Sequence, residues 1–198
     1  MYDLSVIIPA RNEMFLSITV ENILKNIRGN TEIIVVLDGE WASPGVPDDK
    51  RVTIIYNHES VGQRAGQNQG ARISRAKYLM KLDAHCVVDE GFDVKMISKM
   101  KDDYTMVPVM YNLYGFDWVC TSCPHRHYQG PTPSGCPKCG KPMKKEIKFA
   151  PRLNRKSLTY RFDHTLHFQY WGSLQKRQQV VDGLMETMSL QGSSFMCT

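Results

Sequence analysis

Apolar and polar segments alternate along the first hundred residues in a way that predicts strands and helices in turn. Continuous apolar runs predict buried strands over residues 4–10, 32–39, 51–57 and 77–85. Apolar residues at helical spacing, or runs of small residues, predict helices over 13–29, 62–76 and 91–101. Continuously apolar strands that alternate with helices are typical of parallel sheets covered on both faces. We therefore expect an α/β fold with a mostly parallel sheet flanked by helices.

Chemically capable residues follow several of these strands directly. Residues 9–13 lie at the carboxyl end of the first predicted strand, Asp38 at that of the second, and Asp83 and His85 at that of the fourth. Ligands of open parallel sheets bind beyond the carboxyl ends of the strands. Residues two apart in an extended segment point to the same side, and a carboxylate with an imidazole suits a divalent metal such as Mn²⁺. The alternative is that Asp83 caps a turn and His85 is a polar surface residue.

Glycine and alanine recur along the predicted helix 62–76 and keep one of its faces thin. The backbone can therefore approach a strand or a ligand closely, beginning at Gly62. Polar side chains lie near the amino end of this helix, where the dipole favours phosphate: Gln63, Arg64, Gln67 and Asn68. Close helix–sheet packing with solvated polar residues is the alternative. No G-x-G-x-x-G follows the first strand, which argues against a dinucleotide site.

Composition adds limits to this interpretation. The chain has 198 residues, enough for one domain with a small appendage. The hydrophobic content of 42% and the charged content of 23% are those of an ordinary globular protein. The formal net charge of +5 permits a polyanionic partner. No apolar run approaches the ~18–20 residues of a membrane span, and the amino terminus lacks a signal-peptide pattern. We expect a cytoplasmic protein without membrane contact.

Four of the six cysteines form two C-x-x-C pairs, separated by twelve residues: Cys120, Cys123, Cys136 and Cys139. This spacing predicts a structural zinc ribbon inserted at 118–142, in which four thiolates complete a tetrahedral Zn²⁺ site. A thioredoxin-like role would need one pair at a helix start, whereas Pro124 and Pro137 favour turns. Cys86 and Cys197 are predicted to be packed or free thiols.

Basic residues with interleaved aromatics surround the predicted ribbon. The basic set is His125, Arg126, His127, Lys138, Lys141, Lys144, Lys145, Lys148, Arg152, Arg155 and Lys156. The aromatic set is Tyr128, Phe149 and Tyr160. This combination suits a phosphate backbone and exposed bases. An ordinary solvated basic face is the alternative.

Three stretches in order, LSVIIPARNE, EIIVVLDG and NHESVGQRAGQNQGARISRAKYLMKLDAH, resemble nucleotide-sugar glycosyltransferases of the GT-A fold. The segment LDAHC is especially similar to the polypeptide N-acetylgalactosaminyltransferases, whose metal motif is Asp-x-His. The tail FQYWGSLQKRQQVVDGLMETMSLQGSSFMCT resembles the approach to that family's glycine-rich, sugar-contacting strand. The resemblance covers residues 3–100 and 166–198. It implies that residues 1–198 form one GT-A domain.

The resemblance implies a role for each matching position. Asp83 and His85 would be the catalytic pair that holds Mn²⁺, or Mg²⁺, against the diphosphate of a UDP-sugar, and Asp38 would hydrogen-bond the nucleobase. The remaining donor-binding positions would be Pro9, Ala10, Arg11, Glu13, Gly62, Arg64, Gly192 and Ser193, with the first four acting largely through backbone. The sugar would be a hexose or an N-acetylhexosamine, transferred with retention as in the closer relatives.

The chain also departs from that family. It stops at Thr198, before the expected Trp-Gly-Gly-Glu-Asn-type segment and a third metal-binding histidine, so either the sequence is truncated at its carboxyl end or the enzyme lacks these parts. His164 and His167 are candidate substitutes for that histidine.

The leading acceptor is a hydroxymethylated pyrimidine in viral DNA, because the ribbon is basic. The alternatives are protein Ser/Thr or polysaccharide as acceptor, and a non-catalytic nucleic-acid-binding zinc protein on a transferase scaffold.

Overall fold

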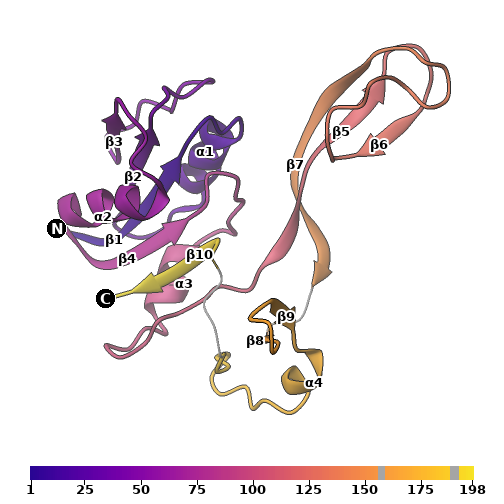
Figure 1. Ribbon diagram of the computed structural model, residues 1–198. Helices are drawn as coiled ribbons and strands as arrows, with labels where there is room; N and C mark the ends of the chain where they lie inside the picture. The colour runs from indigo at the N-terminus through magenta and orange to yellow at the C-terminus, as the bar shows by residue number, and fades with distance from the viewer. Residues whose placement is uncertain (156–158, 188–191) are drawn as a thin grey trace. The chain divides into compact units, whose positions relative to one another are not determined.

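The computed structural model describes residues 1–155, 159–187 and 192–198, which belong to two compact units. The first unit comprises Met1–Val109 and Ser157–Thr198, and the second comprises Met110–Lys156. Figure 1 shows the strands and helices of each unit. Because the second unit contains residues 118–142, the cysteine pairs lie outside the first unit, which carries the mostly parallel sheet.

A five-stranded sheet forms the centre of the first unit, in the order β10-β4-β1-β2-β3. Its strands are β1 (Tyr2–Ala10), β2 (Thr31–Asp38), β3 (Val52–Asn57), β4 (Ala76–Leu82) and β10 (Ser194–Cys197). The first four pair in parallel, and β10 pairs antiparallel with β4. The sheet is therefore mostly parallel, as the apolar runs predict.

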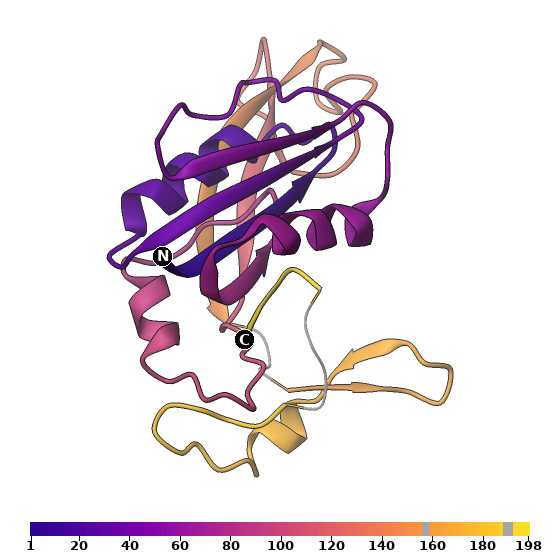
Figure 2. The same cartoon turned by 90° about the vertical axis from the view of Figure 1, so that its left-hand side faces the viewer.

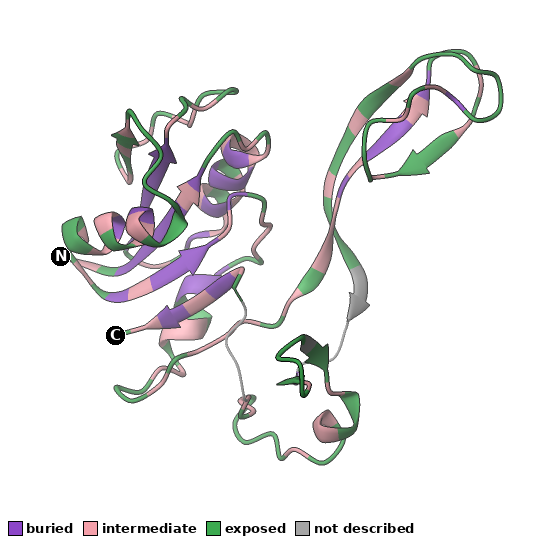
Figure 3. Cartoon of the chain, viewed as in Figure 1, coloured by how far each residue is buried: buried purple, intermediate pink, exposed green. Residues whose placement is uncertain are grey.

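Helices cover both faces of this sheet: α1 (Leu16–Asn26), α2 (Gln63–Ile73) and α3 (Phe92–Ile97). The larger apolar cluster joins Val6 and Val35 of the sheet to Val20 and Ile23 of α1. On the other face Ile7 and Ile34 pack toward α2. Figure 2 shows α1 and α2 on opposite faces, and Figure 3 shows the buried residues gathered in the central strands. Burial on both faces explains why these strands are apolar throughout.

The register brings three strand ends to one edge of the sheet. Ala10 pairs with Leu37, so Asp38 follows at the level of the chain just beyond β1. Ile7 pairs with Lys81, so Asp83 lies level with Pro9. Parallel strands share the edge at which they end, and that edge positions ligands in open α/β sheets.

The fourth predicted strand, residues 77–85, is too long. Strand β4 ends at Leu82, and Ala84 and His85 lie in a bend. The alternation of side chains in an extended strand therefore does not extend to His85, and tertiary contacts must set its direction. The helix predicted over 91–101 is likewise shorter, since α3 ends at Ile97.

The second unit is an antiparallel three-stranded sheet, in the order β6-β5-β7. Its strands are β5 (Tyr111–Cys120), β6 (Arg126–Tyr128) and β7 (Met143–Arg155). The pairing of β5 with β7 carries register irregularities between Tyr111 and Leu113 and between Tyr114 and Phe116. Sequence analysis does not predict this ribbon beyond the cysteine segment itself.

The segment between the second unit and β10 contains short elements only: β8 (Tyr160–Phe162), β9 (Phe168–Tyr170) and the one-turn helix α4 (Gly172–Gln175). Strands β8 and β9 pair antiparallel. In the part of the chain that the structure describes, no helix has the length and apolar character needed to cross a bilayer.

The thin face of α2 packs directly on the sheet. A Cβ atom added at Gly70 would lie 2.6 Å from Cγ2 of Ile7, and one at Gly66 would lie 3.3 Å from Cγ1 of Val36. Ile7 and Val36 are buried in the smaller apolar cluster, so they have little room to move. The structure thus favours helix–sheet packing as the reason for these two glycines.

Gly70→Ala is expected to destabilise the first unit. The added methyl group overpacks the contact with Ile7, which costs about 1–3 kcal/mol and outweighs the ~1 kcal/mol by which alanine favours a helix. Urea unfolding should show a lower midpoint at unchanged slope. Gly45→Ala is the control, because nothing lies within 4 Å of a Cβ atom at that position. Equal or greater stability of Gly70→Ala would contradict the packing argument.

Candidate functional site

The carboxyl edge of the parallel strands carries the side chains that the sequence singles out. Arg11 and Glu13 follow β1, Asp38 ends β2, and Asp83 and His85 follow β4. Asp38 is buried, Asp83 is partly buried and His85 is exposed. The fold therefore gathers five predicted site residues at one edge, from three neighbouring strands.

Asp38 holds the loop that leads into α2. Its Oδ1 accepts a hydrogen bond from the Val61 amide at 2.6 Å, and its Oδ2 accepts one from the Ser60 hydroxyl at 2.8 Å and one from the Gly62 amide at 3.1 Å. Burial raises the pKa of Asp38, but these hydrogen bonds outweigh it and leave the pKa below its usual value. A carboxylate has about four acceptor positions, so the three hydrogen bonds from described residues leave one for the predicted nucleobase contact.

The predicted phosphate contacts begin directly after the loop that Asp38 holds. The amides of Val61 and Gly62 already donate to Asp38, while Arg64 is exposed on the first turn. Arg11 donates from its guanidinium to the Ser60 hydroxyl at 3.2 Å. Arg11 and Arg64 are thus the cationic groups of this end of the site.

Lys81 is a site residue that the sequence pattern does not reveal. It lies on β4, is 4% exposed, and donates to Oδ1 of Asp83 and to the carbonyl oxygen of Gly192. The Asp83 amide donates to the Ser193 carbonyl at 2.9 Å. One buried ammonium therefore connects the predicted metal-binding aspartate to the predicted sugar-contacting segment. The neighbouring residues 188–191 of that segment lie outside the described residues.

His85 is held by Glu13, which follows β1. Nδ1 of His85 lies 3.0 Å from Oε2 of Glu13, and Oε1 of Glu13 accepts the Phe15 amide at 3.2 Å. The hydrogen bond to Glu13 raises the pKa of His85. Burial raises the pKa of Glu13, but the bond to His85 and the Phe15 amide lower it below the usual value.

The donor atoms that remain at Asp83 and His85 fit a divalent cation. Among the described residues, none donates a hydrogen bond to Oδ2 of Asp83 or to Nε2 of His85. One carboxylate oxygen and one imidazole nitrogen are ligands that Mn²⁺ accepts, and Mg²⁺ accepts the oxygen. The remaining positions of such an ion would be filled by water and donor phosphates, as is usual for Mg²⁺ sites.

A third protein ligand for that ion is not found in the described part of the chain. There, the groups of three or more His, Cys, Asp or Glu within metal-binding reach include neither Asp83 nor His85. The candidate substitutes His164 and His167 lie in the β8–β9 turn, where Nδ1 of His167 lies 2.8 Å from the Thr165 hydroxyl. Both stay predictions as ligands.

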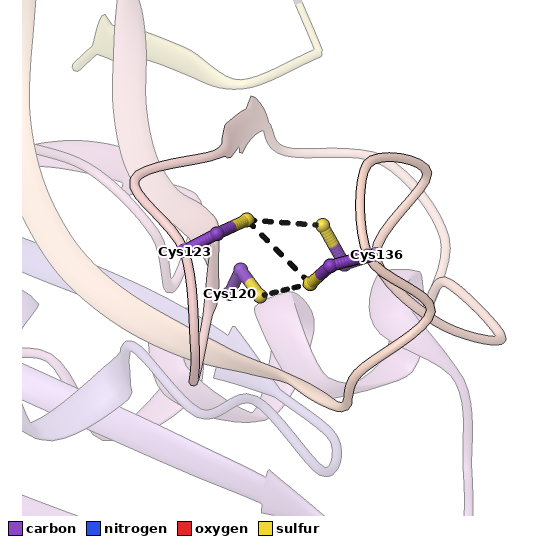
Figure 4. A group of neighbouring side chains, drawn as sticks. Cys120, Cys123 and Cys136 are labelled. Carbon is purple, nitrogen blue, oxygen red and sulfur yellow. Dashed lines mark hydrogen bonds between the residues drawn. The ribbon is translucent and has the colours of Figure 1, made fainter.

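The four cysteine thiols of the second unit converge (Figure 4). The Sγ atom of Cys139 lies 3.4 Å from that of Cys120 and 3.6 Å from that of Cys123, which is 3.6 Å from that of Cys136. A tetrahedral Zn²⁺ with ~2.3 Å bonds to sulfur places its ligands about 3.8 Å apart. The cluster therefore has the dimensions of a structural zinc site.

Backbone groups support this cluster on both knuckles. The Ser122 amide donates to Sγ of Cys120 and the Lys138 amide donates to Sγ of Cys136, both at 3.4 Å. The Cys136 amide also donates to the Lys141 carbonyl at 2.8 Å. Gly140 has φ +69, a conformation that favours glycine and lets the second knuckle turn tightly. Donors aimed at sulfur stabilise thiolates, the form that binds metal.

The open, mostly parallel sheet places this chain in the class of α/β proteins whose ligands bind beyond the carboxyl ends of the strands. The chain belongs to glycosyl transferase family 2, whose sequence profile matches residues 5–171. The predicted GT-A fold and glycosyltransferase family are thereby confirmed. The finer similarity to polypeptide N-acetylgalactosaminyltransferases stays a prediction.

One curated relative is similar over part of the chain. Glycosyltransferase GlyG of Streptococcus pneumoniae serotype 4 is 27% identical over 121 residues, which cover 58% of this chain and 40% of that protein. The chain thus spans less than half the length of this curated relative.

Two solved structures are similar over part of the fold. The mannosyltransferase PcManGT from Pyrobaculum calidifontis, in complex with GDP-Man and Mn²⁺, is 15% identical with a TM-score of 0.44, covering 55% of this chain and 35% of that one. Residues 1–349 of S. aureus TarS are 14% identical with a TM-score of 0.41, covering 64% and 47%.

Replacing Cys136 and Cys139 by serine is expected to release about one zinc ion per chain, because two of four ligands are lost. Hydrogen exchange should rise across residues 118–142, while the circular dichroism of the sheet persists. The matched control is the double variant Cys86→Ser/Cys197→Ser, which removes two thiols outside the cluster. Metal analysis that finds no zinc in the native protein would overturn the assignment.

Proposed function

We propose that this protein transfers a sugar from a UDP-sugar to a hydroxyl acceptor with the help of a divalent cation. The observation that supports the proposal is that Asp38, Asp83 and His85 lie at strand ends on the same carboxyl edge of the parallel sheet, in a chain of glycosyl transferase family 2. The open ligand atoms of Asp83 and His85 support the metal, and the remaining acceptor position of Asp38 supports a nucleobase contact.

Each group has a defined part in this reaction. Asp83 and His85 would hold Mn²⁺ or Mg²⁺, which as a Lewis acid neutralises the charge that develops on the departing diphosphate. Arg11 and Arg64 would add cationic contacts at the start of α2. The backbone of Gly192 and Ser193 would lie beside the donor sugar, held there by Lys81 and the Asp83 amide.

The identity of the sugar and the stereochemistry follow the resemblance of the segment LDAHC alone. On that basis the sugar is a hexose or an N-acetylhexosamine, and the anomeric configuration is retained. The product of UDP-sugar turnover, analysed by NMR for its anomeric configuration, decides between retention and inversion.

For the acceptor we propose a hydroxymethylated pyrimidine in DNA, of the kind that viral genomes carry. Residues 110–156 contain nine Lys or Arg and two acidic residues, whereas the rest of the chain contains sixteen and eighteen. The excess positive charge of the protein thus belongs to the second unit. Such segregation suits contact with a phosphate backbone, and a 5-hydroxymethyl group supplies the hydroxyl that a transferase needs.

The structure divides the basic residues of this unit into two sets. Arg126 donates to Asp117 at 3.0 Å and to Glu146 at 2.7 Å, and Lys148 also pairs with Glu146. Lys145 lies over the Phe116 ring at 4.7 Å, and Arg152 lies over Tyr128. These cations stabilise the ribbon itself.

The second set is exposed at the cysteine end. It consists of Lys138, Lys141 and Lys144, whose side chains have no ion pair among the described residues. Lys138 lies between Cys136 and Cys139, and Lys144 pairs through its backbone with Val119, next to Cys120. We propose these three ammonium groups as the phosphate contacts. Lys156 of the predicted basic set lies outside the described residues.

Two other interpretations lead to different results in the same experiments. A transferase that acts on protein Ser/Thr or on polysaccharide would turn over UDP-sugar without needing DNA. A non-catalytic nucleic-acid-binding protein would bind DNA but never hydrolyse UDP-sugar. The thiolate cluster and a DNA acceptor both suit a reducing, intracellular compartment, which we propose for this protein.

Asp83→Asn is expected to abolish the part of UDP affinity that depends on Mn²⁺. The amide keeps the shape and can still accept from Lys81, but it loses the anionic ligand, so the loss should exceed the ~10–100-fold typical of supporting residues. Calorimetry with and without Mn²⁺ measures it. Asp89→Asn, in the same loop and 71% exposed, is the control. Unchanged Mn²⁺ dependence in Asp83→Asn would remove the metal assignment.

The triple variant Lys138→Glu/Lys141→Glu/Lys144→Glu should weaken DNA binding and reduce the slope of log affinity against log salt by about 2–3, as expected for three lost phosphate contacts. Lys25→Glu/Lys50→Glu/Lys77→Glu changes the net charge equally from exposed positions of the first unit. Equal weakening by both triples would refute the patch. Labelled sugar that never enters hydroxymethylated DNA would refute the acceptor.

A further inference from the structure

Glu13 carries a carboxylate whose two oxygens are both engaged. Oε1 accepts the Phe15 amide at 3.2 Å, just before α1, and Oε2 lies 3.0 Å from Nδ1 of His85. The first contact fixes the carboxylate relative to the backbone that follows β1. The second reaches 72 residues along the chain, to the bend after β4. Glu13 therefore connects a rigid strand end to a segment that has left its strand.

The direction of the His85 ring depends on this contact. His85 lies in a bend, so strand geometry does not orient its side chain. The side chain is 53% exposed, whereas that of Glu13 is 24% exposed. The Nδ1 side of the ring thus faces a fixed carboxylate, while Nε2 lies on the opposite side of the ring.

We infer that Glu13 is a positioning residue that holds His85 through Nδ1 and leaves Nε2 as its metal-binding atom. An ionised carboxylate only accepts hydrogen bonds, so Nδ1 must carry a proton, and in the neutral imidazole Nε2 then keeps its lone pair. Metal-ligating histidines generally donate their second ring N–H to such a carboxylate, which sets both tautomer and orientation. The inference rests on the proposed metal role of His85, but the tautomer it requires exists without metal.

The same geometry gives Glu13 a different task from the one that the resemblance assigns. Among donor-binding residues, Glu13 would line the nucleotide pocket largely through its backbone. Its side chain then acts through His85 and never touches the donor. Loss of the carboxylate should weaken metal binding while leaving metal-free UDP binding intact.

The first experiment determines the tautomer of His85 in the metal-free protein. Long-range ¹H–¹⁵N spectra at about pH 9, well above the ordinary histidine pKa of ~6.5, report which nitrogen is protonated. Among the six histidines, the signals of His85 are identified as those that are lost in His85→Asn. We expect the Nδ1–H form in the native protein and reversion to the Nε2–H form in Glu13→Ala. A native Nε2–H form would overturn the inference whatever the metal does.

The second experiment measures Mn²⁺ binding by electron paramagnetic resonance, using Mn²⁺ alone as the probe. Glu13→Gln keeps an oxygen for the Phe15 amide but loses the charge, and should bind Mn²⁺ about 10–100-fold more weakly. Glu21→Gln, the same change at an exposed position of α1, should match the native protein.

The outcomes separate the two proposals. If the native protein and Glu13→Gln bind Mn²⁺ equally well, the positioning role of Glu13 is refuted while the proposed metal dependence stands. No Mn²⁺ binding by the native protein, with His85 in the Nδ1–H form, refutes the proposed metal dependence and confirms the hold of Glu13 on His85.

Discussion

The parallel pairing of β1 with both β2 and β4 is the constraint on which the candidate site depends. It aligns Ala10 with Leu37 and Ile7 with Lys81, so the chain leaves three neighbouring strands at one edge. Ala10 and Leu37 are 27 residues apart in sequence, and Ile7 and Lys81 are 74 apart, so backbone pairing alone brings distant parts of the chain to this edge. The apolar clusters on both faces fix this register, because a slip by one residue would turn each strand's side chains to the opposite face.

Charged contacts then hold the loops beyond that edge. Asp38 holds the loop that leads into α2, and Glu13 holds His85. Lys81 donates to Asp83 and also to Gly192, which is 111 residues away from Lys81 in sequence. Lys81 is a buried cation, and its contacts with Asp83 and Gly192 offset the cost of removing an ammonium group from water. Asp38, Glu13 and Lys81 thus each contact a segment that is distant in sequence. This is how a preorganised site is built from loops.

The sequence predicts the central strands β1 and β2 well because they are buried on both faces and therefore continuously apolar, whereas β3 is an edge strand whose apolar run is partly exposed. It predicts the end of β4 poorly, since Leu82-Asp83-Ala84-His85 has no breaker and the bend is set by Glu13 and Ser193. Lys81 is missed for a similar reason: a lone lysine in an apolar strand resembles a solvent-facing residue until β10 is known to pair beside it. The local sequence pattern shows the periodicity of a strand, whereas the end of β4 and the burial of Lys81 depend on contacts with residues that are distant in sequence.

The second unit follows a different physical logic from the sheet. Its buried apolar side chains in the described ranges are Trp118, Cys120 and Cys136, too few for a conventional core. Metal binding is the ordinary source of folding free energy for such a module. Cross-strand contacts such as Lys145 over Phe116 and Arg126 with Asp117 stabilise the strands between. The four-cysteine cluster is where such a metal would bind. If metal and strand contacts supply the stability, the exposed lysines around the knuckles have no structural task and are available for the proposed contact with a polyanion.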